Sequence, residues 1–267
     1  MNTVAPQAIF DGAIQTLPLT QASLDLLDYV NQIVKQNFGC DISEVRLDTS
    51  EQVPNFVRCA SATKTAFTDG ASTRPLLKKL IQARYSPELL AGMLVDPPRL
   101  RIIPNSAILN SGISYNYRTH RDTWYGGVQQ QINHWMAVAN VTANSTMYMA
   151  PAYYNLPVDN NSEIFDLDTW DQKYRKQAVN NVKVEARPHP GAVITLADAE
   201  REPVVLANGN EIAFSGHHLH GSATNTTDLV RFSLDYRVVL AVGDWQYPKN
   251  IDNRATGDLR NYMYSLE

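Results

Sequence analysis

Cysteine is scarce in this chain, since Cys40 and Cys59 are the only two among 267 residues. Two isolated cysteines in a chain of this length do not make a disulfide framework, so we expect reduced thiols in the core. No lysine or arginine cluster stands out and the net charge is −4. This charge pattern argues against a nucleic-acid partner.

Two further absences concern membranes and secretion. No apolar run approaches the length of a transmembrane helix. The N-terminal stretch lacks a basic segment and carries Asp11, so it does not resemble a secretory signal. We therefore expect a soluble, cytoplasmic protein with no membrane partner. The sequence does not indicate an oligomeric state.

What is present suits a single domain spanning residues 1–267. Hydrophobic residues make up 44% of the chain and charged residues 19%, which allows a substantial core. There is no internal repeat and no low-complexity linker. We expect residues 1–98 to be largely helical, residues 99–240 to form a β core, and residues 241–267 to be a C-terminal extension.

Capping residues and apolar spacing predict three early helices. Thr20 can cap a helix that Gly39 would end. Its apolar positions fall at helical spacing: Leu24, Leu27, Val30 and Val34. A second helix is expected from about Thr73 to Ile81. A third should begin at Ser86-Pro87-Glu88, where proline takes the first helical position.

From about residue 99 the sequence changes to short strand-like runs separated by turns. These runs are Leu100–Ile103, Ile113–Tyr117, Val128–Val138, Thr146–Met149, Val182–Ala186, Ala192–Leu196, Glu211–Phe214 and Leu229–Leu240, with a helical insertion near Asp168–Val179. Many short strands without alternating helices indicate a sandwich or barrel. We therefore predict a mostly β fold with the N-terminal helices packed on one face.

The residues that carry chemistry begin with a His-x-Asp triplet, His120 and Asp122, which follows a predicted strand. A third candidate, His220, comes 100 residues later. Two imidazoles and one carboxylate can hold one face of a ferrous ion and leave the other open. Arg231 and Ser233 follow on one face of the last strand, and a guanidinium matches a carboxylate bidentately. A lone His-x-Asp is weak evidence, because most such triplets are a capping aspartate beside a surface histidine.

The last predicted strand alternates cleanly between polar and apolar residues. One face carries Leu229, Arg231, Ser233, Asp235 and Arg237, and the other carries Val230, Phe232, Leu234, Tyr236 and Val238. The polar face would point either into solvent or into a barrel that holds a charged ligand. Periodicity alone leaves both interpretations open.

Three segments together resemble a known family. They are Thr119–Tyr125 (THRDTWY), Trp135–Pro151, and the stretch HLHGSATNTTDLVRFSLDYR from His218 to Arg237. They are similar to the phytanoyl-CoA dioxygenase-like branch of the Fe(II)/2-oxoglutarate-dependent oxygenases, over roughly residues 100–240. One departure is that Ala152-Tyr153-Tyr154 follows Pro151, where the family often has Gly-Ser-His. The departure affects the local loop and substrate contacts.

The resemblance implies a double-stranded β-helix, or jelly-roll, core. It also implies that His120, Asp122 and His220 bind iron, that Arg231 pairs with the distal carboxylate of 2-oxoglutarate, and that Ser233 adds a hydrogen bond. The reaction would consume dioxygen and convert 2-oxoglutarate to succinate and CO₂ while a small-molecule substrate is oxidised. Related halogenases have glycine or alanine in place of Asp122, so this aspartate favours hydroxylation, desaturation or ring closure over halogenation.

Several other residues are candidates for the pocket or compete as ligands. The expected pocket residues are Trp124, Tyr125, Gln129, Gln131, Asn133 and Trp135, although an exposed polar strand face or plain aromatic packing would explain them as well. His220 is preferred to His217 and His218 because of its distance from Arg231 and the Gly-Ser that follows. We expect His134 and His189 to be structural.

Three alternatives to an oxygenase stay open from the sequence. One is a related non-haem iron enzyme that performs halogenation, desaturation or oxidative cyclisation. A second is a non-catalytic jelly-roll binding domain, which would not need the intact ligand set. The third is a metal-dependent cupin without a cosubstrate, which would not need Arg231 and Ser233 on one strand face.

Overall fold

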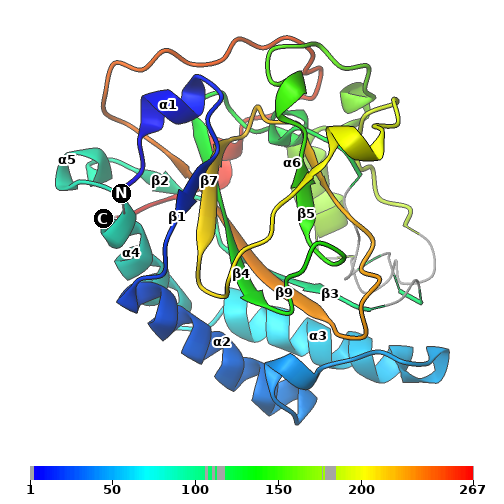
Figure 1. Ribbon diagram of the computed structural model, residues 1–267. Coiled ribbons are helices and arrows are strands. Elements are labelled where there is room, and N and C mark those ends of the chain that lie inside the picture. Colours follow the sequence, from blue (N-terminus) through cyan, green and yellow to red (C-terminus); the bar gives the residue numbers. More distant parts are fainter. Residues whose placement is uncertain are drawn as a thin grey trace.

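The computed structural model describes residues 3–105, 108–109, 112, 118–175, 177 and 185–266. It is a mixed α/β fold with two antiparallel sheets (Figure 1). The helices are α1 (Pro6–Phe10), α2 (Gln21–Phe38), α3 (Val53–Thr68), α4 (Thr73–Arg84), α5 (Pro87–Leu90) and α6 (Leu167–Thr169). The strands are β1 (Gln15–Leu17), β2 (Leu94–Val95), β3 (Arg99–Ile103), β4 (Gln131–Ala139), β5 (Met147–Met149), β6 (Glu202–Pro203), β7 (Glu211–Ser215), β8 (His220–Ser222), β9 (Arg231–Val239) and β10 (Tyr264–Ser265).

The larger sheet runs in the order β1-β7-β4-β9-β2-β10, and β3 also pairs with β9. The smaller sheet has the order β6-β5-β8. Strands β1 and β2 come from the part expected to be largely helical, and β10 comes from the C-terminal extension. All three nevertheless pair within the larger sheet. Strand β1 pairs with β7, β2 pairs with β9, and β10 pairs with β2.

Helices α2, α3 and α4 cover one face of the larger sheet (Figure 1). The N-terminus of α2 forms as expected, because the hydroxyl of Thr20 accepts a hydrogen bond from the backbone N–H of Ser23. The helix ends at Gly39, whose φ of 78° lies in the left-handed region that favours glycine. Alternate residues of β9, among them Phe232, Leu234 and Tyr236, join the helices in the main core.

The two sheets are joined by a second apolar cluster. Trp135, Ile212 and Phe214 of the larger sheet pack with Met147 and Met149 of β5. Since β9 turns its apolar side chains toward the helices, its polar side chains face the space between the sheets. The alternation found in the sequence is therefore an inward-facing charged row and not a solvent-exposed one.

Several expected elements differ in the structure. The stretch Ala192–Leu196 is not a strand, because only Ala192 makes an isolated bridge, to Asn160. The helical insertion begins as α6 and passes into a π-helical stretch, Trp170–Tyr174, while residues 176, 178 and 179 of the expected range lie outside the described residues. The expected strand Ile113–Tyr117 and residues 182–184 of Val182–Ala186 lie outside the described residues, and Glu185 and Ala186 are not in a strand. Among the described residues, no helix combines the length and apolar character needed to cross a membrane.

Candidate metal centre

Two histidines far apart in the sequence are held side by side by their own backbones. The N–H of His120 donates to the carbonyl of His220 at 2.7 Å, and the N–H of His220 donates to the carbonyl of His120 at 2.9 Å. This reciprocal pair forms an antiparallel bridge at the end of β8. Directly opposed residues of such a pair place their side chains on the same face, so the two imidazoles meet with ring centroids 4.3 Å apart.

Asp122 joins the histidines because the intervening residue is extended. Arg121 has φ −108° and ψ 146°, so the side chains of His120 and Asp122 project to one side and that of Arg121 to the other. The buried Arg121 guanidinium donates from Nε to Asp252 at 3.0 Å and from Nη2 to the carbonyl of Tyr153 at 2.8 Å. It thereby ties this turn to the C-terminal extension.

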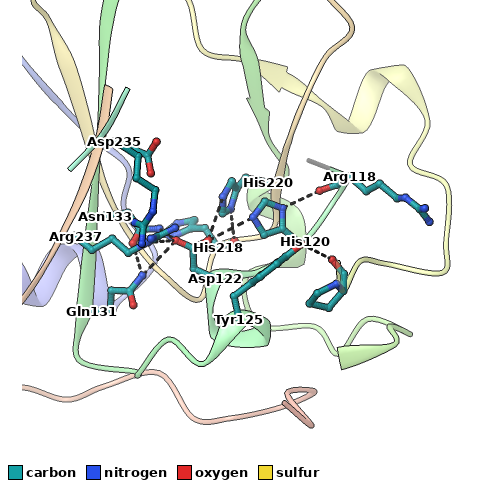
Figure 2. A network of polar contacts seen from close by, with 12 residues as sticks. Arg118, His120, Asp122, Tyr125, Gln131, Asn133, His218, His220, Asp235 and Arg237 are labelled. Atoms are coloured by element: carbon teal, nitrogen blue, oxygen red, sulfur yellow. Dashed lines mark hydrogen bonds and ion pairs between the residues drawn. The ribbon is translucent and has the colours of Figure 1, made fainter. Parts of the chain in front are cut away.

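The three potential ligand atoms converge on one point (Figure 2). The Nε2 atoms of His120 and His220 lie 3.4 and 3.9 Å from Oδ1 of Asp122. Each imidazole is oriented from behind, because Nδ1 of His120 lies 2.7 Å from the carbonyl of Arg118 and Nδ1 of His220 lies 2.9 Å from that of His218. A carbonyl can only accept, so Nδ1 carries the proton and Nε2 presents its lone pair.

The charge states at this point suit a cation. Burial, assisted by the neighbouring His120, lowers the pKa of His220 to about 3, so the ring is neutral at pH 7. Burial, the largest single effect, raises the pKa of Asp122, but the positive charge of Arg237 and the interactions with His120 and His220 together outweigh it and hold that pKa well below its usual value. Among the described residues, His120, Asp122 and His220 are the group of histidine, cysteine or acidic side chains placed to hold a metal, with ligand atoms within 4.8 Å of one another.

Gln131 and Asn133, two of the expected pocket residues, lie against Asp122 (Figure 2). Their amide nitrogens donate to Oδ2 of Asp122 at 3.3 and 2.8 Å, and Nε of Arg237 donates to the same oxygen at 2.8 Å. The strands β4 and β9 therefore bind one oxygen of this carboxylate and leave Oδ1 directed toward the histidines.

The ligand group opens into a cavity of about 380 Å³ between the two sheets. Its wall is formed by side chains of the larger sheet, of the smaller sheet and of the segment after α6. They include Trp135, Phe214 and Arg231 on one side, and Met147, Phe165 and Trp170 on the other. A volume of this size suits a small organic ligand.

Arg231 is buried in this cavity wall without a counter-charge of its own. Its side chain is 2% exposed, and within the described part of the chain its Nε and Nη1 have no hydrogen-bond partner. Burial, with repulsion from Arg101, lowers the pKa of Arg231 to about 9, which keeps the guanidinium charged at neutral pH. A buried cation with unused donors is costly unless an anion binds it.

The nearby acid that could neutralise Arg231 is already engaged. Asp235 accepts two hydrogen bonds from Arg101, one at 2.5 Å from Nε and one at 3.0 Å from Nη2. Ser233 lies between Arg231 and Asp235 on the same face of β9. It is fully buried, its Oγ has no partner among the described residues, and it does not reach the cavity wall that they form.

Four of the expected pocket residues lie at the cavity and two do not. Tyr125, Gln131, Asn133 and Trp135 line it. Trp124 instead packs in a separate apolar cluster and donates from Nε1 to Asp252 at 2.8 Å. Gln129 lies in the turn before β4, outside the cavity wall. The Asp122–Tyr125 stretch is a 3-10 helix. With three residues per turn, the side chains of Trp124 and Tyr125 project about 120° apart, so only one of them points toward the cavity.

The remaining histidines have other contacts. His134 stacks on Tyr236 and approaches Tyr85 through Nε2 at 2.7 Å. His218 lies between the carbonyls of Ser215 and Gly12, while His217 packs edge-on against Tyr154. His189 is buried beside Trp170. None of them is a member of the ligand group found among the described residues.

Two residues at the site were not expected as site residues. The periodicity of the last strand correctly predicted which face Arg237 lies on, but it did not indicate that Arg237 contacts Asp122. Asp96, in the loop after β2, accepts a hydrogen bond from Nη1 of Arg237 at 2.8 Å. Nothing in the local sequence around Asp96 indicates this contact, because its partner lies 141 residues away.

No family model and no curated protein matches this chain. Among solved structures, EvdO2 from Micromonospora carbonacea var. aurantiaca complexed with 2-oxoglutarate is 13% identical, covers 99% of this chain and 100% of its own, and has a TM-score of 0.48. The epimerase SnoN in complex with Fe3+, alpha ketoglutarate and nogalamycin RO is 14% identical with a TM-score of 0.46, covering 92% of this chain and 86% of its own. ThoJ, a non-heme monooxygenase in its apo form, is 17% identical with a TM-score of 0.43, covering 95% and 89%. Likenesses this weak assign neither family nor activity.

Proposed function

We propose that this chain is an Fe(II)- and 2-oxoglutarate-dependent oxygenase that acts on a small molecule. The observation that carries the proposal is the buried Arg231 guanidinium, whose Nε and Nη1 have no hydrogen-bond partner among the described residues. It lines the same cavity as the converging Nε2, Oδ1 and Nε2 atoms. A metal alone would not need such a cation, whereas a dicarboxylate that also binds the metal would use both features.

The residues fit the two groups chemically. Two imidazoles and a carboxylate on one side of a point are the donor set of ferrous oxygenases. When bound there with dioxygen, iron and 2-oxoglutarate would supply an oxidant that attacks a substrate C–H bond, with release of succinate and CO₂. In this proposal the fold is a double-stranded β-helix whose two halves are the two sheets, and it is one domain.

The chain's own residues bind and orient the reactants. His120, Asp122 and His220 would hold the metal, with their orientation fixed from behind by backbone carbonyls and by donors to Oδ2. Arg231 would bind the distal carboxylate in a bidentate manner. Ser233, which does not line the cavity formed by the described residues, stays a predicted further donor. Arg101 supports this role because it keeps Asp235 from pairing with Arg231.

The substrate would occupy the part of the cavity beside the ligand group, where Tyr125, Phe165 and Trp170 form the wall. Tyr125 packs edge-on against His120 with ring centroids 5.1 Å apart, and its hydroxyl donates to the carbonyl of Pro190 at 2.8 Å. Phe165 and Trp170 continue this wall away from the ligands. The presence of Asp122 favours hydroxylation or another oxidation over halogenation. The cytoplasmic location stays a prediction from the sequence.

The test is succinate formation by the iron-loaded protein in air with 2-oxoglutarate and a panel of candidate small molecules. The expected result is succinate above background, increased by a substrate that is itself oxidised. His220→Ala is the matched control, because it removes a ligand without touching Arg231. Succinate formation no greater than in His220→Ala across the panel would contradict the proposed function.

A further inference from the structure

The two oxygens of the Asp122 carboxylate have different surroundings (Figure 2). Oδ2 accepts hydrogen bonds from Arg237 and Asn133 at 2.8 Å each and from Gln131 at 3.3 Å. Oδ1 faces the two histidines. An oxygen that already accepts three donors has no lone pair left for a metal, so Oδ1 is the oxygen available for coordination.

Arg237 is itself fixed in a buried chain of charges. Its Nη1 donates to Oδ2 of Asp96 at 2.8 Å, and its own carbonyl accepts from the backbone N–H of Asp96 at 2.9 Å. Asp96 is fully buried and also binds Arg99, with Nη2 of Arg99 3.2 Å from its Oδ1. The guanidinium of Arg237 is therefore held between two carboxylates and reaches Asp122 in a preset geometry.

We propose that Arg237 is a positioning residue that makes Asp122 a one-oxygen ligand and thereby preserves an open coordination position. The inference rests on the proposed function. An octahedral metal that takes three atoms from the chain and two from a chelating 2-oxo acid keeps one position free. Without Arg237, Oδ2 would keep only the neutral amide donors of Asn133 and Gln131. Neutral hydrogen bonds are about half as strong as charge-assisted ones, so Oδ2 would be drawn to the dication and fill that position.

A purely structural role for Arg237 makes a different prediction. If Arg237 served only to neutralise Asp96 and hold β9 in place, its loss would lower stability and leave the coordination of a folded, metal-loaded protein unchanged. The two roles are therefore separated by a probe of the open position and not by activity.

The probe is nitric oxide, added without air to protein loaded with Fe(II) and 2-oxoglutarate, with the iron–nitrosyl signal followed by electron paramagnetic resonance. We expect Arg237→Met to bind iron and 2-oxoglutarate but to bind nitric oxide about 10–100-fold more weakly than the unmodified protein. Arg237→Gln, which keeps one donor near Oδ2, should show a smaller loss. Arg187→Met is the matched control, because Arg187 lines the same cavity but pairs with Glu185 at 2.7 Å.

Nitric oxide affinity equal to that of the unmodified protein in Arg237→Met, or in Arg237→Gln should the first variant not fold, would overturn the proposal. So would an equal loss in Arg187→Met. Failure of the proposed function looks different: the unmodified protein would then bind no iron, or would form no chelate with 2-oxoglutarate, before any nitric oxide is added.

Discussion

Replacing Arg231 with leucine should weaken the binding of 2-oxoglutarate while leaving iron in place. The guanidinium is 2% exposed and its Nε and Nη1 lack partners among the described residues, so the distal carboxylate would meet a largely desolvated charge. Removing one member of such a pair costs about 2–5 kcal/mol. The dissociation constant should therefore rise by about thirty-fold or more.

The assay is an anaerobic titration of the iron-loaded protein with 2-oxoglutarate, followed by the charge-transfer absorption of the chelate. Arg231→Lys should rescue affinity poorly, because an ammonium lacks the planar fork that matches a carboxylate. Arg260→Leu is the control, since Arg260 is exposed, pairs with Asp258 and does not line the cavity. Bound iron should be the same in all three variants.

The stability of the Arg231→Leu variant distinguishes a loss of binding from misfolding. Because the described residues give Nε and Nη1 of the buried Arg231 no hydrogen-bond partner, Arg231→Leu should be no less stable than the unmodified protein in the absence of 2-oxoglutarate. Unchanged affinity for 2-oxoglutarate in a folded, iron-loaded Arg231→Leu variant would refute the reasoning. The metal-dependent cupin without a cosubstrate would then be the better interpretation.

Five further variants test the ligands, the cosubstrate contact and the core. His120→Ala and Asp122→Ala should each remove most of the bound iron in metal analysis, and undiminished iron in both would reject the ligand assignment. Asp122→Gly should abolish or strongly reduce oxygenation and open a position for halide; full hydroxylation by this variant, measured with and without chloride, would contradict it. Arg101→Met should release Asp235 to pair with Arg231 and weaken 2-oxoglutarate binding by about ten-fold in the same titration, and equal affinity would argue against this sequestering role. Arg84→Met removes the arginine that pairs with the fully buried Glu211. The free energy of unfolding, measured in urea, should fall by about 3–5 kcal/mol. A fall below about 1 kcal/mol would show that the pair contributes little to stability.

Local signals in the sequence predicted the elements that have strong caps or clean periodicity. Thr20 and Gly39 bound α2 as expected, and the alternation of β9 placed Arg231 and Arg237 on one face. Helix α3 was not predicted. Its buried positions include Cys59, Ala60 and Thr63, which are small or polar and give little apolar signal. Tertiary packing against α2 and β3, and not periodicity, identifies this helix.

The site was predictable in its residue types but not in its supporting contacts. The two-residue spacing of His120 and Asp122 already placed them together, because an extended Arg121 turns both to one side. The pairing of Asp122 with Arg237 joins residues 115 apart, and no local pattern encodes it. Trp124 was assigned to the pocket on proximity, but a turn of 3-10 helix directs it elsewhere.

The central claim is tested most directly by a crystal structure of the protein grown without air in the presence of Fe(II) and 2-oxoglutarate. We expect one iron bound by Nε2 of His120, Oδ1 of Asp122 and Nε2 of His220. The distal carboxylate of 2-oxoglutarate should accept hydrogen bonds from the guanidinium of Arg231. A metal bound through other residues, or a 2-oxoglutarate whose distal carboxylate lies away from Arg231, would contradict it.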